Sequence, residues 1–286
     1  MKILSPAKIN LFLQVTGKRP DGYHELFSLM CCVDLCDTIY LRFGPQNIRI
    51  ESSHPQIPLD DTNLAHRAAA LFFKALNVND GVEIYIDKSI PVAAGLGGGS
   101  SNAASVLKGL NQYYRYPFPR KQLMSMGLGL GADVPFFLFG KPALASGIGE
   151  KLVAHPGSLP YHVVLVYPGF KVATAEVFQK LNLGLTKYKK KTKRLFSTKN
   201  DFDPGLHLCN DLETVTTSEY PVITSIKEQL LTWGALGTLM SGSGPSVFGL
   251  FSDSHTAERA KQAIGENTRW DVFVCEIFDG TYPGGQ

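Results

Sequence analysis

The chain has 286 residues, of which 44% are hydrophobic and 19% are charged, a composition typical of a globular protein with room for two domains. The formal net charge is +3, but six basic residues lie in one run from Lys187 to Arg194, so the rest of the chain does not indicate nucleic-acid binding. The five cysteines include no Cys-x-x-Cys pair, which argues against a cysteine metal site or a disulfide framework, and we expect reduced thiols in a cytoplasmic protein.

Membrane and targeting segments are not predicted. Pro6, Lys8 and Asn10 interrupt the apolar stretch that a signal peptide would need. Two uncharged stretches, 89–107 and 234–252, are rich in Gly, Ser and Pro, which favours loops over membrane spans. We interpret the run from Lys187 to Arg194 as a solvated loop, although a general attraction for an anionic substrate stays open.

Elements of both kinds are predicted in the first half of the chain. Residues 7–15 alternate between apolar and polar, which predicts a half-buried strand with Lys8 and Asn10 on the same face. Asp61 or Thr62 is expected to cap the first helix. The other predicted strands cover residues 38–43, 48–51 and 82–86, and the predicted helices cover residues 63–76, about 101–114 and 120–128.

The second half shows no regular strand–helix alternation. A hairpin of strands 143–146 and 150–154 is expected first, and a glycine-rich turn from Met240 to Ser246 lies between apolar strands. This irregular order predicts an α+β fold, with domains at residues 1–155 and 156–286. The remaining predictions are strands at 163–167 and 272–277 and helices at about 174–181, 208–217, 222–233 and 255–264.

The segment Pro91-Val-Ala-Ala-Gly-Leu-Gly-Gly-Gly-Ser-Ser-Asn-Ala-Ala104 is the most informative in the chain. Glycines let a backbone fold tightly and point its N–H groups inward, and a helix that follows adds its own free N–H groups and positive dipole end. The segment lacks the lysine of a P-loop and the third glycine of a dinucleotide fingerprint. It therefore predicts a different kind of phosphate cradle, and a nucleotide triphosphate as its ligand.

Two charged residues are candidates for chemistry next to such a cradle. Lys8 lies in an apolar strand, so it needs either an anionic ligand or a structural ion pair. Asp133 precedes Val-Pro-Phe-Phe and is either a carboxylate that orients an attacking hydroxyl or only a helix N-cap. Spacing alone does not decide whether Lys8 and Asp133 meet.

Three motifs, Pro6–Leu13, Pro91–Ala104 and Leu239–Ser246, resemble the ordered motifs of the GHMP kinase superfamily. Within it, Lys18-Arg-Pro-Asp-Gly-Tyr-His-Glu25, Gly131-Ala-Asp-Val-Pro-Phe-Phe137 and Asn210-Asp-Leu-Glu213 resemble the 4-diphosphocytidyl-2-C-methyl-D-erythritol kinases. The resemblance implies a two-domain fold, with an N-terminal ribosomal protein S5 domain 2-like domain and a C-terminal ferredoxin-like GHMP domain. It also implies phosphorylation of the substrate's 2-hydroxyl by ATP with Mg²⁺, in the non-mevalonate route to isoprenoid precursors.

The resemblance implies a role for each candidate residue. Lys8 and Asp133 would be the catalytic pair, and Asn10 would lie beside the substrate's phosphates or hydroxyls. Tyr23 and His24 would bind the cytidine end, with Phe178 on the opposite face of the cytosine. No residue dedicated to the metal is implied, so a serine of the loop, or ATP and water alone, would hold Mg²⁺. The ATP phosphates would be wrapped by Pro91, Val92, Ala93, Ala94, Gly95, Leu96, Gly97, Gly98, Gly99, Ser100 and Ser101.

Several alternatives stay open at this point. One is another GHMP kinase acting on homoserine or mevalonate, and another is a non-catalytic nucleotide- or RNA-binding protein on the same scaffold. The motif Leu239–Ser246 either packs against the glycine loop or is a plain tight turn. Val92-Ala-Ala94 replaces a more glycine-rich start of the loop, which stiffens it. We expect a small-molecule substrate, no nucleic acid, no membrane, and a monomer or weak dimer.

Overall fold

The computed structural model describes residues 1–182 and 202–278, so the basic run from Lys187 to Arg194 lies outside the described residues. The chain divides into two compact units. The first contains Met1–Ala7, Leu35–Val92 and Gly97–Gly140, and the second contains Lys8–Asp34, Ala93–Leu96 and Lys141–Gln286. Within the described ranges no helix is long and apolar enough to cross a bilayer.

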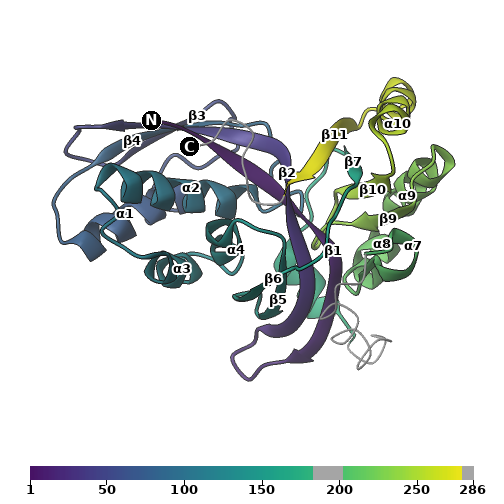
Figure 1. Cartoon of the computed structure of the whole chain (residues 1–286), viewed down its shortest axis with the longest axis horizontal. Helices are drawn as coiled ribbons and strands as arrows, with labels where there is room; N and C mark the ends of the chain where they lie inside the picture. The colour runs from purple at the N-terminus through teal and green to yellow at the C-terminus, as the bar shows by residue number, and fades with distance from the viewer. Residues whose placement is uncertain (183–201, 279–286) are drawn as a thin grey trace. The chain divides into compact units, whose positions relative to one another are not determined.

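The units interleave along the chain because two long strands belong partly to each. These strands are β1 (Lys2–Lys18) and β2 (His24–Phe43), which pair with each other and are the two long purple ribbons of Figure 1. The predicted domain boundary between residues 155 and 156 therefore does not coincide with the division into compact units. As a boundary between the two domains of the family it stays a prediction.

The first unit combines a sheet with a helical layer. In the sheet, β4 pairs antiparallel with the end of β2 and parallel with β3. Helix α2 contacts α1, α3 and α4. The bounds in this unit are β3 (Arg49–Ser52), α1 (Leu64–Leu76), β4 (Val82–Asp87), α2 (Gly98–Tyr113), α3 (Arg120–Leu128) and α4 (Val134–Phe139).

The second unit contains an antiparallel sheet in the order β11-β7-β10-β9, on which α9 and α10 pack. Strand β5 pairs with β2 and forms the predicted hairpin with β6, and the short β8 runs parallel to β1. The bounds are β5 (Ala143–Gly147), β6 (Lys151–Ala154), β7 (His162–Tyr167), α5 (Thr174–Lys180), α7 (Pro204–His207), β8 (Cys209–Asn210), α8 (Glu213–Glu219), α9 (Val222–Thr232), β9 (Gly237–Met240), β10 (Val247–Phe251), α10 (Ser254–Asn267) and β11 (Asp271–Phe278).

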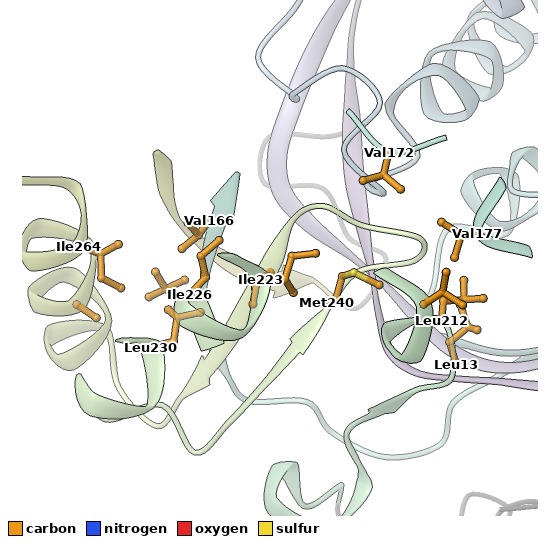
Figure 2. Close-up of a cluster of buried hydrophobic side chains, with 14 of the residues drawn as sticks. Leu13, Val166, Val172, Val177, Leu212, Ile223, Ile226, Leu230, Met240 and Ile264 are labelled. Carbon is orange, nitrogen blue, oxygen red and sulfur yellow. The ribbon is translucent and has the colours of Figure 1, made fainter. Parts of the chain in front are cut away.

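One hydrophobic cluster holds the second unit together. It joins the sheet residues Val164 and Val166 to Ile226 and Leu230 of α9 and to Ile264 of α10. Figure 2 shows that the cluster continues past Met240 to Leu13 of β1 and to Leu212, which precedes α8. The strand that carries Lys8 is therefore anchored to the same core as the glycine-rich turn after Met240.

Several local predictions were wrong. The strand predicted over residues 7–15 is buried on both faces instead of half-buried. Asn63, not Asp61 or Thr62, caps α1, because its side chain accepts the Ala65 N–H. The predicted helix 208–217 begins instead as strand β8, and the helix α8 starts only at Glu213. Cys209 and Asn210 pair with β1, and this long-range pairing cannot be recognised from the local helical pattern of the sequence.

Candidate functional site

The glycine loop, Pro91–Ser101, has an alternating backbone in its centre. Ala93, Gly95 and Gly97 have φ angles of 55°, 78° and 69°, whereas the residues between them do not have positive φ. Such alternation of positive with non-positive φ is typical of backbone nests, in which successive N–H groups point toward one side and bind an anion. Ala93 adopts this conformation at a cost of about 1–2 kcal/mol, so the Val92-Ala-Ala94 departure keeps the shape of the loop with some strain.

The helix after the loop begins earlier than the sequence predicts, at Gly98 instead of about residue 101. Its N-cap is Gly97, and no side chain caps it. The first N–H groups of such a helix have no partner within the helix and carry its positive dipole end. The glycine loop therefore ends in a helix N-terminus whose donors are available to an anion, as expected for a phosphate cradle.

Hydrogen bonds in the first unit fix Ser101 where the loop enters α2. The Ser5 hydroxyl lies 2.9 Å from both the Ser101 hydroxyl and the Asn102 Oδ1. These three side chains are buried, whereas Ser100 is half-buried. Ser101 thus has a structural partner that the sequence did not indicate, and Ser100 is the more accessible loop serine.

Lys8 and Asn10 lie on one face of β1, as their spacing predicted. Both are buried, and Lys8 Nζ donates to Asn10 Oδ1 at 2.5 Å. Asn10 Nδ2 in turn donates to the Ser28 hydroxyl at 2.9 Å, and that hydroxyl donates to the Phe12 carbonyl at 2.6 Å. The ammonium is therefore held by a polar relay inside an apolar strand, and only Ser28 of this relay was missed from the sequence.

The glycine-rich motif Leu239–Ser246, here called the third motif, packs against the glycine loop. The Ser241 hydroxyl donates to the Gly95 carbonyl at 3.0 Å, and the Ser246 N–H donates to the Ala94 carbonyl at 3.3 Å. A Cβ on Gly95 would lie only 2.2 Å from the Ser241 carbonyl oxygen. The packing prediction is confirmed, and it explains why glycine is needed at position 95.

The third motif also approaches Lys8. A Cβ on Gly242 would lie 3.3 Å from Lys8 Nζ and 3.6 Å from Asn10 Oδ1. The Lys8 N–H donates to the Leu96 carbonyl at 2.9 Å, which ties the glycine loop to β1. Within the second unit, the glycine loop therefore contacts the backbone of Lys8, while Asn10 and the third motif lie next to its ammonium.

Asp133 occupies the N-cap position of α4 but does not act as its cap. No side-chain capping bond is made there, and the residue is half-buried in the first unit. The purely structural interpretation of Asp133 as a capping residue is therefore not supported. Lys8 belongs to the second unit, so the pairing of Lys8 with Asp133 stays a prediction.

Two of the predicted cytidine-binding residues, Tyr23 and His24, lie at the end of the turn between β1 and β2. Arg19 pairs with both Asp21 and Glu25, and the Asp21 carboxylate accepts the Tyr23 N–H at 3.2 Å. This network is exposed, so it orders the turn without contributing much stability. Tyr23 is exposed, with 58% of its surface accessible.

His24 and Phe178 lie together although 154 positions separate them in the chain. Their rings stack with centroids 5.2 Å apart and an interplanar angle of 27°. Partial burial, and secondarily the charge of Lys18, lower the pKa of the imidazole. His24 is therefore neutral near pH 7, with one ring nitrogen able to donate and one able to accept a hydrogen bond.

A further buried ion pair, which the sequence did not indicate, lies in the first unit next to the glycine loop. Lys88 Nζ is 2.5 Å from Asp37 Oδ2, and the other carboxylate oxygen accepts the N–H groups of Ser89 and Ile90 at 2.9 Å. A Cβ on Gly98 would lie 3.1 Å from Lys88 Nζ. The pair therefore fixes the backbone that leads into the loop.

Comparison with known families identifies both halves of the chain. Residues 63–141 match the model of the GHMP kinases N terminal domain, and residues 197–269 match that of the GHMP kinases C terminal. The 4-diphosphocytidyl-2-C-methyl-D-erythritol kinase of Syntrophotalea carbinolica is 48% identical, over 96% of this chain and 97% of its own. The chain belongs to this family of GHMP kinases. The enzyme of the same name from Syntrophus aciditrophicus is 45% identical over 98% of this chain and 100% of its own.

Solved structures agree with this family and with the predicted two-domain GHMP kinase fold. A crystal structure of 4-(cytidine 5'-diphospho)-2C-methyl-D-erythritol kinase is 33% identical, with a TM-score of 0.81 over 96% of this chain and 99% of its own. Homoserine kinase from Cytophaga hutchinsonii has a TM-score of 0.78 at 20% identity, over 98% of this chain and 95% of its own, which shows the shared fold alone. The family and the fold predicted from the motifs are therefore confirmed.

Proposed function

We propose that this protein transfers the γ-phosphoryl group of ATP to the 2-hydroxyl of 4-diphosphocytidyl-2-C-methyl-D-erythritol, a step of the non-mevalonate route to isoprenoid precursors. The observation that carries the proposal is the 42–48% identity, over nearly the full length, to relatives named for this activity. A new bond forms between the substrate oxygen and the γ-phosphorus, the bond from that phosphorus to the β,γ-bridging oxygen breaks, and ADP leaves.

The glycine loop is the proposed site of the ATP phosphates. Its centre has the alternating φ angles that are typical of a nest, and the start of α2 has no side-chain cap. The residues from Pro91 to Ser101 would thus bind the triphosphate mainly through backbone donors. Backbone donors held by a packed loop need little reorganisation when charge develops on the transferring group.

Lys8 and Asp133 are the proposed catalytic pair. The buried ammonium of Lys8 would offset negative charge on the phosphoryl group, with Asn10 beside it to contact the substrate. Asp133 would accept the hydroxyl proton or orient it, since a loose transition state needs little activation of the nucleophile. A lysine close to Asp133 would also keep that carboxylate ionised.

Tyr23, His24 and Phe178 are proposed to bind the cytidine end. The His24–Phe178 stack supplies aromatic faces, and Tyr23 adds an exposed ring from the neighbouring position. A neutral imidazole can pair with the donors and acceptors on the edge of a cytosine. These three residues would distinguish a cytidylyl substrate from a small alcohol such as homoserine.

Magnesium would enter this site with ATP. Among the described residues, no three His, Cys, Asp or Glu side chains cluster as a metal site. The phosphate oxygens and water would therefore supply most ligands, with Ser100 the more accessible of the two loop serines. Bound there, Mg²⁺ would neutralise phosphate charge.

We further propose that this protein is cytoplasmic and that it works as a monomer or weak dimer.

ADP release in a coupled assay tests the proposal. Purified protein with MgATP should turn over 4-diphosphocytidyl-2-C-methyl-D-erythritol, and not mevalonate or homoserine in parallel wells. Turnover of another alcohol alone would contradict the substrate assignment. ATP binding without turnover of any alcohol would instead indicate a non-catalytic protein on the GHMP scaffold.

Asp133→Asn tests the catalytic pair directly. The amide keeps the size of the side chain but cannot take a proton, so ATP should bind almost normally while most of kcat is lost. ATP affinity is measured by nucleotide titration and kcat by ADP release. Retained turnover would remove Asp133 from the mechanism.

A further inference from the structure

The segment from Asn210 to Glu213 is fixed to the strand that carries Lys8. Its first residue lies in β8, which runs parallel to β1 with Leu13 opposite Asn210. The Asp211 N–H donates to the Leu13 carbonyl at 3.0 Å, and the Asp211 carboxylate accepts the Val15 N–H at 2.8 Å. The segment therefore has a rigid base from which its other side chains can position a neighbour.

The side chain of Asn210 is hydrogen-bonded to the backbone of the third motif. It is buried, and its Nδ2 donates to the carbonyls of Met240 and Gly242 at 2.8 and 2.7 Å. Its Oδ1 accepts the Leu212 N–H at 3.0 Å. Both amide hydrogens and the amide oxygen are thus used, and an aspartate, which has no side-chain donor when ionised, cannot reproduce this pattern.

Glu213 binds the same residue of the third motif, Met240, at its backbone N–H. One carboxylate oxygen accepts the Met240 N–H at 2.7 Å, and the other accepts from Lys227 Nζ at 2.7 Å. The N–H and the carbonyl of Met240 are therefore both bound by side chains of one four-residue segment. Hydrogen bonds to a charged group are stronger than neutral ones, so the Glu213 carboxylate holds the Met240 N–H strongly.

The position of Gly242 matters because it faces the ammonium. A Cβ there would be 3.3 Å from Lys8 Nζ, so a small shift of this backbone changes the room and the dipoles around Lys8. Asn210 contacts Gly242 directly, and Glu213 fixes Met240, two positions earlier. The route from Asn210 through Gly242 to Lys8 runs entirely within the second unit.

We propose that Asn210 and Glu213 are positioning residues for phosphoryl transfer, which set the place of the third motif against Lys8. The inference rests on the proposed function, in which Lys8 is catalytic. The residues would not touch the substrate. Their effect would be on kcat, through the geometry of Lys8, more than on the affinity for ATP.

The test uses Asn210→Asp, which keeps size but presents an oxygen to two carbonyls. A misplacement near the reacting atoms by about 1 Å can cost about 100-fold in rate, so we expect kcat to fall about tenfold to 100-fold with ATP affinity little changed. Glu213→Ala frees the Met240 N–H and gives a second measurement if Asn210→Asp does not fold. Unfolding temperatures are measured for every variant.

A matched control is Asn111→Asp. Asn111 is also buried and braces a turn, donating to the Phe118 carbonyl at 3.0 Å and accepting the Phe118 N–H at 3.1 Å. It lies in the first unit, at the C-terminal end of α2. Its replacement should lower the unfolding temperature while kcat of the folded protein stays near the parent value.

A double-mutant cycle with Lys8→Met separates positioning from a general structural role. If Asn210 acts through Lys8, the double variant should be no slower than Lys8→Met alone, because effects on one shared partner do not add. Multiplied losses, or a kcat for Asn210→Asp equal to that of Asn111→Asp, would overturn the inference. Normal turnover by Lys8→Met would instead overturn the catalytic role of Lys8, and the inference with it.

Discussion

Replacing Gly95 with alanine tests whether the glycine loop and the third motif must touch. Gly95 has a φ of 78°, which costs an L-residue about 1–2 kcal/mol. The new Cβ would lie 2.2 Å from the Ser241 carbonyl oxygen and 2.9 Å from that of Gly244, both in the backbone. The nearer oxygen would have to withdraw by about 1 Å, and a displacement of this size beside a reacting centre can lower the rate about 100-fold.

Gly169→Ala is the matched control for this substitution. Gly169 has a φ of 86°, but a Cβ built on it meets nothing within 4 Å. Gly169→Ala therefore carries the cost of the backbone conformation without the collision. ADP-release kinetics and thermal unfolding should show Gly95→Ala both slower and less stable than the control. Equal activity and equal unfolding temperatures would refute the view that close packing sets the shape of the glycine loop.

Three further predictions follow from single contacts. Lys88→Met strips the buried Asp37 carboxylate of its cation, which should cost roughly 3–5 kcal/mol of unfolding free energy in urea titrations, and a parent-like value would contradict a structural role for the pair. Burial raises the pKa of the Asp211 carboxyl, so the folded state loses stability as pH rises through that pKa. Asp211→Asn keeps an acceptor for the Val15 N–H. This variant should unfold at a higher temperature than the parent protein at pH 7, but not below about pH 4, the ordinary pKa of an aspartate, where the parent carboxyl is also uncharged. A lower unfolding temperature at pH 7 would show the charge to be stabilising. Tyr23→Ala should raise KM for the cytidylyl substrate and leave KM for ATP unchanged, whereas equal losses for both would point to misfolding.

The sequence alone determined the parts of this protein that depend on local pattern. Alternation over residues 7–15 put Lys8 and Asn10 on one face, because side chains on a strand repeat every two residues. The predicted helix 120–128 matches α3. The glycine loop indicated a phosphate cradle because glycine permits backbone conformations that other residues avoid. The three motifs of the chain predicted its family, which the comparisons confirm.

The first half of β2 shows why some elements were not predictable. Residues 27–33 are buried on both faces of the strand, so the sequence lacks the alternation that marks a half-buried strand. The start of α2 was also missed, because glycines disfavour helix by propensity but are accepted in a first turn that follows Gly97. In both cases the tertiary environment overrode the local signal.

Only the tertiary structure decided which distant residues meet. Three contacts join segments that no sequence periodicity relates. They are the stack of His24 on Phe178, the hydrogen bond from Ser241 to Gly95 and the hydrogen bond from Asn210 to Gly242. Local pattern reports on the backbone and on which face of an element is buried. Which faces then pack together depends on the summed burial and hydrogen bonding of the whole unit, and those energies are set only when the chain is folded.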